Sequence, residues 1–187
     1  TKDLPKDQIN SIEQKINKHF EELNITYQFE FKKFESEYDL LYTFFHKFVR
    51  NFPMMTGWNY VNFDWKYMLN RSKKLGIDPT ISSPTGTLLT KNELPAHVGC
   101  LDYMDIYAKW DRSIDIKENL KLDTAGESVL GIKKVKYDGT LQDLYEKEYP
   151  KFIFYNAVDT ILVQLIHEKI KTMEIALTIA HMSQISI

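Results

Sequence analysis

Two aspartates stand in local patterns that could support chemistry. Asp64 ends the segment Thr56-Gly-Trp-Asn59-Tyr-Val-Asn-Phe63-Asp64, where a short strand turns into a helix that this residue opens. A carboxylate at such a junction can cap the helix or face a ligand. Asp159 follows Tyr155 by four residues in a helical pattern, so the phenol and the carboxylate project from one face. Because that face is largely apolar, Asp159 needs a hydrogen-bond partner, a counter-charge or a cation.

The elements that must position these residues follow from the spacing of apolar side chains. Helical spacing occurs in residues 9–23, 40–49, 64–75 and 150–166. Strict alternation over Ile25-Thr-Tyr27-Gln-Phe29-Glu-Phe31 predicts a half-buried strand, and Met54–Gly57 and Val98–Met104 are further candidate strands. Strands that alternate with helices indicate an α/β domain.

Composition limits the classes of function. The chain has 187 residues, of which 43% are hydrophobic, with a net charge of -2 and one cysteine. This length fits one domain with a real core, and the near-neutral charge argues against a broadly basic nucleic-acid groove. A single cysteine cannot form an internal disulfide, and no apolar run reaches the roughly 18 residues of a membrane span. The histidines show no zinc-like pairing with one another or with Cys100.

The two aspartate motifs gain meaning from their combination. The pattern N-x-x-x-F-D, followed 95 residues later by Y-x-x-x-D in a long helix, resembles two of the three motifs of the 3′–5′ proofreading exonuclease domain of family B DNA polymerases. Within that family the sequence most resembles the replicative polymerases of T-even-like bacteriophages. Three further segments support the resemblance, which covers residues 27–187: Leu101-Asp-Tyr-Met-Asp105-Ile-Tyr107, Val135-Lys-Tyr-Asp-Gly139 and Phe154-Tyr-Asn-Ala-Val-Asp-Thr160.

The resemblance implies an RNase H-like exonuclease fold, a mixed sheet flanked by helices, and a nuclease that uses two divalent cations, Mg²⁺ or Mn²⁺. Asp159 would be a direct metal ligand, and Asp64 would support the metal pair largely through water. Tyr155 would orient the attacking water or the scissile phosphate. The residues that would bind the terminal nucleotides of a single-stranded DNA 3′ end are Asn59, Phe63 and Tyr67.

One departure from the family pattern matters for activity. The family's first motif, an Asp-x-Glu on the opening strand, has no counterpart in residues 1–58, and the chain begins at Thr1 without Met. We therefore expect a single partial exonuclease domain over residues 1–187, with an amphipathic helix over 1–24, a core over 25–187 and the first strands lacking. The isolated chain would then be inactive or nearly so, because too few acidic ligands remain for a good metal site.

The expected partners follow from the same resemblance. They are primer-template DNA and the remainder of the polymerase, in the cytoplasm of a bacterial host and without a membrane. An exposed sheet edge could also drive self-association. The alternative is a non-catalytic RNase H-like DNA-binding or assembly subunit of a split polymerase. An unrelated α/β fold, with chance motif matches, would instead place Tyr155 and Asp159 far from Asp64.

Other charged and aromatic residues have both ordinary and functional interpretations. Asp105 fits a cap for a helical turn, although in relatives the neighbourhood of Asp102 and Asp105 lies close to the active cleft. Trp58 or Phe63 could stack on a terminal base. Two small basic faces are either solvated or in contact with phosphate; one comprises Lys66, Arg71, Lys73 and Lys74, and the other Lys133, Lys134 and Lys136. Lys66 stands where phage relatives tend to have proline.

Overall fold

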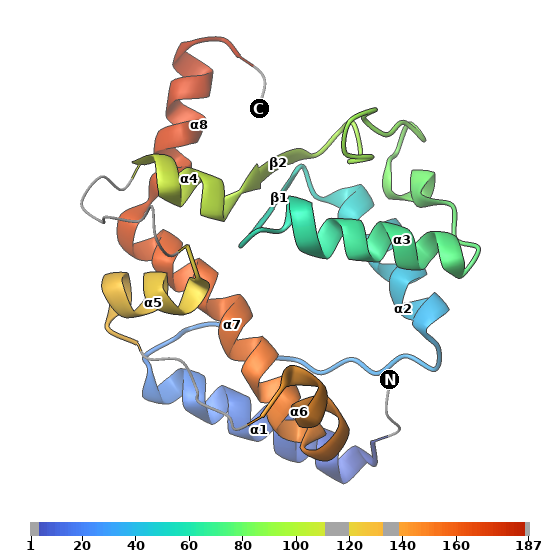
Figure 1. Ribbon diagram of the computed structural model, residues 1–187, viewed down its shortest axis with the longest axis vertical. Helices are drawn as coiled ribbons and strands as arrows, with labels where there is room; N and C mark the ends of the chain where they lie inside the picture. The colour runs from blue at the N-terminus through green and yellow to red at the C-terminus, as the bar shows by residue number, and fades with distance from the viewer. Residues whose placement is uncertain (1–3, 111–119, 133–138, 186–187) are drawn as a thin grey trace.

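The computed structural model describes residues 4–110, 120–132 and 139–185 (Figure 1). It is rich in helix, with a small sheet beside a long diagonal helix. The α-helices are α1 (Lys6–Glu22), α2 (Glu37–Thr43), α3 (Lys66–Lys74), α4 (Tyr103–Trp110), α5 (Leu122–Leu130), α6 (Leu141–Lys147), α7 (Tyr149–Ile170) and α8 (Thr172–Met182). The strands are β1 (Met54–Gly57) and β2 (Gly99–Asp102), and the shorter π and 3₁₀ turns are η1 (Phe44–Phe48), η2 (Val49–Asn51), η3 (Val61–Trp65) and η4 (Pro79–Ser82).

The two strands run parallel, with Met54 opposite Gly99 and Gly57 opposite Asp102. Their carboxyl ends therefore meet at one edge of the sheet. The chain continues from β1 into η3 and α3, and from β2 directly into α4. The expected α/β class is confirmed, and the arrangement is consistent with a partial RNase H-like exonuclease domain. Within the described residues, the sheet consists of these two parallel strands.

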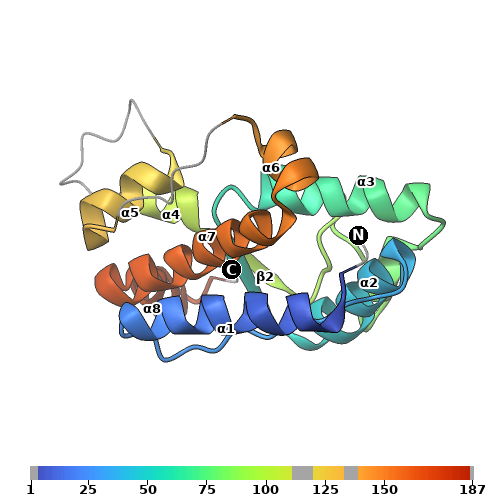
Figure 2. The same ribbon diagram turned by 90° about the horizontal axis from the view of Figure 1, so that it is seen from below.

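Helix α7 is the central support of the molecule. It passes between α1 on one side and α5 on the other (Figures 1 and 2). Its Ala157 packs with Ile16 and Phe20 of α1, whereas its Leu162 packs with Ala125 of α5. The crossing with α5 is close, because a Cβ on Gly126 would lie 2.8 Å from a Leu162 methyl carbon. The predicted long helix after Glu148 is thus confirmed, with Pro150 in its first turn.

The strand predicted over residues 25–31 is wrong. The segment is irregular and lies between α1 and α7, where α1 side chains take the place of a neighbouring strand. The Asn17 amide group binds both the N–H and the C=O of Phe29, at 2.6 and 3.0 Å, and a Glu13 carboxylate oxygen accepts the N–H of Phe31 at 2.5 Å. Four residues along a helix and two along an extended chain both advance about 6 Å, so these pairings stay in register.

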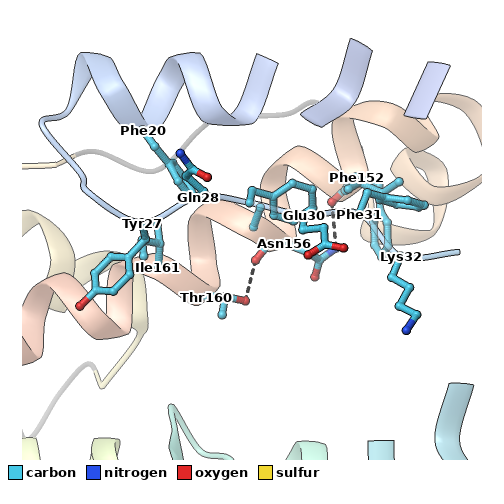
Figure 3. A pocket seen from close by; sticks show the side chains of 13 residues that line it. Phe20, Tyr27, Gln28, Glu30, Phe31, Lys32, Phe152, Asn156, Thr160 and Ile161 are labelled. Carbon is cyan, nitrogen blue, oxygen red and sulfur yellow. Dashed lines mark hydrogen bonds between the residues drawn. The ribbon is translucent and has the colours of Figure 1, made fainter. Parts of the chain in front are cut away.

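This segment and α7 together line a largely apolar pocket of about 510 Å³ (Figure 3). Phe20, Phe29 and Phe31 line it from one side, and Phe152 and Ile161 from the other. The alternating pattern therefore arises because one face of the segment packs on α7, and not because the segment pairs in a sheet.

Among the described residues, no helix is long and apolar enough to cross a bilayer.

A single buried carboxylate joins the ends of the two strands. Asp102, the last residue of β2, is 7% exposed and accepts three backbone N–H groups. One carboxylate oxygen accepts from Asn59 at 2.9 Å and from Met104 at 3.1 Å, and the other accepts from Val61 at 3.1 Å. The turn after β1, the start of η3 and the start of α4 are all held by this one side chain.

We expect Asp102→Ala to lower the free energy of unfolding by about 3 kcal/mol, because it leaves three amides without their acceptor. Asp102→Asn should cost about half as much, since the amide keeps one oxygen for Asn59 and Met104. Urea unfolding followed by tryptophan fluorescence measures both effects. Asp105→Asn is the matched control, because this exposed neighbour in α4 should change stability by less than about 0.5 kcal/mol. Equal stability of the Asp102→Ala and Asp105→Asn variants would contradict the assigned role.

Candidate active site

A cavity of about 730 Å³ opens between the carboxyl end of β1 and the middle of α7. Asp64 of η3 and Asp159 of α7 both line it, although 95 residues separate them in the sequence. The rest of its wall combines backbone, aromatic and polar side chains, namely Tyr27, Thr56, Gly57, Trp58, Tyr60, Phe63, Leu122, Asn156, Thr160, Ile161, Val163 and Gln164. The two sequence motifs therefore contribute to one site.

Asp64 does not cap the helix, contrary to one interpretation of its motif. The helical region begins earlier, at Val61, and Asp102 takes the amides that a cap would bind. Asp64 instead lies inside the π-helical turn η3, a form of helix that occurs often at functional sites. Burial raises the pKa of the Asp64 carboxyl, and the negative charge of Asp102 raises it further, although its own backbone N–H opposes the shift. A cation beside this exposed side chain would oppose both effects and favour the charged carboxylate.

Asp159 reaches the cavity from the middle of α7 and is half-buried. Tyr155 lies one helical turn earlier and is only 5% exposed. Its ring is part of the interior, whereas Asp159 is part of the cavity wall. Tyr155 is not among the residues that line the cavity, so a shared role for this phenol and the Asp159 carboxylate stays a prediction.

The three predicted substrate-binding residues occupy different positions. Phe63 lines the cavity and is 68% exposed. Tyr67 lies one turn further along, on α3, where it is 63% exposed beyond the cavity wall. Asn59 occupies the turn after β1 with a left-handed φ of 56° and donates its N–H to Asp102. Phe63 is therefore the one of the three that faces the cavity directly.

Trp58 and Phe63 both line the cavity, but their contacts with the rest of the protein differ. The Trp58 indole N–H donates to the carbonyl of Leu120 at 2.9 Å, and its ring packs on Tyr107 with centroids 5.3 Å apart. Trp58 is thus fixed as part of the wall. Phe63, which is largely exposed, is the better candidate to stack on a base.

The carboxylates suit a hard divalent cation, since Mg²⁺ commonly binds through one or two protein carboxylates together with substrate phosphate and water. Asp64 and Asp159 supply such a pair. Within the part of the chain that the structure describes, no cluster of three or more His, Cys, Asp or Glu side chains could hold a metal ion. Two carboxylates alone leave the rest of a cation's coordination to water or phosphate.

Asp102 is the residue whose importance the sequence did not reveal. Its neighbourhood was expected near the cleft, but its role as the acceptor of three amides was not. Burial raises the pKa of the Asp102 carboxyl, and its backbone hydrogen bonds oppose that shift. The cap expected at Asp105 is wrong, because α4 begins at Tyr103 and Asp102 binds the amide of Met104. Residues 135–138 of the Val135–Gly139 segment, and the basic face of Lys133, Lys134 and Lys136, lie outside the described residues.

Comparison with known proteins gives the family of this chain. A family model of the exonuclease domain of family B DNA polymerases matches residues 4–124. The DNA-directed DNA polymerase of Escherichia phage RB69 is 29% identical over 167 residues, which cover 82% of this chain and 18% of the relative. That of Enterobacteria phage T4 is 28% identical over 146 residues, with 71% and 16% covered. The DNA polymerase catalytic subunit of Epstein-Barr virus (strain B95-8) is 29% identical over 136 residues, with 64% and 12% covered.

The chain spans less than a fifth of the length of these curated relatives. The family match nevertheless covers more than half of the chain and includes Asn59, Phe63, Asp64 and Asp102. The alignment with the phage RB69 polymerase extends over 82% of the chain. The chain therefore belongs to the exonuclease-domain family of the family B DNA polymerases.

Proposed function

We propose that this chain is the 3′–5′ proofreading exonuclease part of a DNA polymerase and that its cavity receives the terminal nucleotides of a single-stranded DNA 3′ end. One observation carries the proposal: Asp64 and Asp159, from segments far apart in sequence, line the same cavity together with the exposed ring of Phe63. Carboxylates that can hold Mg²⁺ or Mn²⁺ beside a platform for base stacking are what hydrolysis of a terminal phosphodiester requires.

Each side chain has a distinct part in this proposal. Asp159 and Asp64 would hold the divalent cations, which activate water and stabilise charge on the phosphate when bound. Phe63 would stack on a terminal base, and Asn59 would shape the turn that places Phe63 and Asp64. Tyr155, which is buried one helical turn before Asp159 on α7, would orient the attacking water or the scissile phosphate, as the family resemblance implies.

The site needs more acidic ligands than these two. In the family resemblance, an Asp-x-Glu strand supplies two further carboxylates, and residues 1–58 contain no such motif. We infer that the remainder of a polymerase completes the site, that residues 1–187 form one partial domain, and that the isolated chain has little or no activity. The edge of β1 opposite β2, which pairs with no other strand in the described residues, could mediate this completion or self-association.

The same scarcity of ligands favours a second candidate function. A chain that binds DNA or another subunit of a split polymerase without catalysis would keep Phe63 and the cavity but would not need further carboxylates. Activity measurements separate the two candidates when they include the completing polymerase region.

The isolated chain should not degrade a labelled single-stranded oligonucleotide measurably faster than buffer containing Mg²⁺ or Mn²⁺. Two carboxylates leave most of a metal pair's coordination to water, so the catalytic ions would bind weakly. The assay follows loss of 3′-terminal nucleotides by gel electrophoresis. Brisk turnover that disappears in Asp159→Ala would sink this expectation, whereas recovery of turnover on fusion to an upstream Asp-x-Glu segment, again abolished by Asp159→Ala, would support the proofreading function over the non-catalytic one.

Asp64 should reduce stability at neutral pH in the absence of metal. Because its folded-state pKa is raised above the usual value of 3.8, its favourable contribution exists at low pH and is lost as pH rises through the folded-state pKa. We therefore expect Asp64→Asn to melt above the wild type at pH 7 in EDTA, with the difference vanishing below about pH 3.8. Thermal unfolding monitored by circular dichroism measures this difference.

Asp105→Asn is again the control and should melt like the wild type at both pH values. Adding Mn²⁺ at pH 7 should raise the wild-type melting temperature and leave that of Asp64→Asn nearly unchanged, because binding to the folded state stabilises it. A wild type that melts above Asp64→Asn in EDTA at pH 7 would contradict the assigned environment of this carboxyl.

A further inference from the structure

The outer face of η3 and α3 carries an unusual set of side chains. At about 100° per residue, positions 66, 67, 70 and 74 of α3 fall on one side of the helix, away from the buried residues Leu69 and Ser72. Phe63, in the preceding turn η3, is exposed as well, whereas Trp65 of that turn is buried. Together these exposed side chains are Phe63, Lys66, Tyr67, Asn70 and Lys74. We name this set the α3 outer face. It presents two aromatic rings one helical turn apart, with a lysine beside them and another at the far end.

Ion pairing separates the four basic residues of this helix into two kinds. Arg71 binds Glu37 at 2.5 Å and Lys73 binds Glu93 at 2.7 Å, so their charges are met by carboxylates. Lys66 and Lys74 have no carboxylate within ion-pair distance among the residues that the structure describes. The two unneutralised cations therefore belong to the α3 outer face, whereas the neutralised ones lie at its borders.

The α3 outer face is continuous with the cavity, because Phe63 belongs to both. From Phe63 to Lys74 the helix advances about 16 Å. A stacked strand advances about 3.4 Å per nucleotide, so this length accommodates at most roughly five nucleotides. In Figure 1, α3 runs away from the β1 end of the sheet toward the edge of the molecule, which gives a strand a path from the cavity to solvent.

We propose that the α3 outer face binds the nucleotides that precede the 3′ end of single-stranded DNA, with Tyr67 as a second stacking platform after Phe63 and with Lys66 and Lys74 as phosphate contacts. Exposed aromatic rings interleaved with unpaired cations are the chemistry of single-strand binding without sequence readout. This inference rests on the proposed function of the cavity, which places the 3′ terminus beside Phe63.

The occupant follows from the charge and the shape of this surface. Lysines without carboxylate partners are complementary to phosphates, and a flat aromatic face is available to every base. The chemistry does not favour duplex DNA, because stacking on Tyr67 requires an unpaired base.

The test is binding of a fluorescein-labelled oligo-dT 12-mer in EDTA, followed by anisotropy at several salt concentrations. The double variant Lys66→Gln/Lys74→Gln should weaken binding and reduce the slope of log affinity against log salt by about 1.4, since each single-strand phosphate contact contributes about 0.7. Tyr67→Ala should weaken binding by at least about fivefold. Lys169→Gln, which removes one charge from an exposed position at the end of α7, should change affinity and slope far less.

Two further measurements separate this inference from the proposed function. They are the DNA binding of Phe63→Ala and the shift in melting temperature when Mn²⁺ is added. If Phe63→Ala abolishes binding while the lysine pair and Tyr67 variants bind like the wild type, the α3 outer face is not the path and the inference fails alone. If the α3 variants lose binding but Mn²⁺ stabilises the wild type and Asp64→Asn equally, the inference holds and the proposed metal site fails. A wild type that binds no single-stranded DNA would overturn the inference outright. Unchanged circular dichroism spectra would show that the exposed-site variants remain folded.

Discussion

The carboxylate of Asp102 fixes the geometry on which the candidate site depends. The carboxyl ends of parallel strands lie at one edge of the sheet. Each strand here is followed by a helix, and the first backbone N–H groups of a helix have no hydrogen-bond partner within it. One side chain at the end of β2 accepts amides from the turn after β1, from the start of η3 and from the start of α4. With those amides satisfied, Asp64 does not act as a cap and is available to line the cavity.

Helix α7 supplies the second half of the site by being buried on several sides. Its side chains pack on both α1 and α5, and its Asp159 lines the cavity at the end of β1. Burial raises the pKa values of the Asp64 and Asp102 carboxyls, and a neighbouring aspartate adds a smaller contribution to each shift. The two strands and α7 thus place several carboxylates where they are partly removed from water, an environment that disfavours their charged form.

Much of this arrangement was predictable from local patterns, and the errors have physical causes. The helix pattern of residues 150–166 and the order of the two aspartate motifs located Asp159 and Asp64 in one site. Alternation over residues 25–31 predicted a strand. An apolar side chain at every second position shows that one face of an extended segment is buried, but it does not show which element the backbone pairs with. Here the backbone binds side chains of α1, namely Asn17 and Glu13. Asp102 was missed as an organising residue because its three partners are backbone amides brought together by strand pairing.

Asp64 and Phe63 are adjacent residues with different candidate roles. The carboxylate could bind a metal ion, and the aromatic ring could stack on a base. Asp64 and Phe63 are neighbours in η3 and both line the cavity, and the Phe63 ring is also 68% exposed to solvent. Tyr67 and Lys74 are exposed further along α3, while Trp65 and Leu69 lie in the core. Phe45 and Tyr60 pack on Trp65 and so fix the buried side of this helical region. This packing also fixes the position of the α3 outer face relative to Asp64. The core contact of one tryptophan thus sets the relation between the acidic cavity and the surface that leads to it.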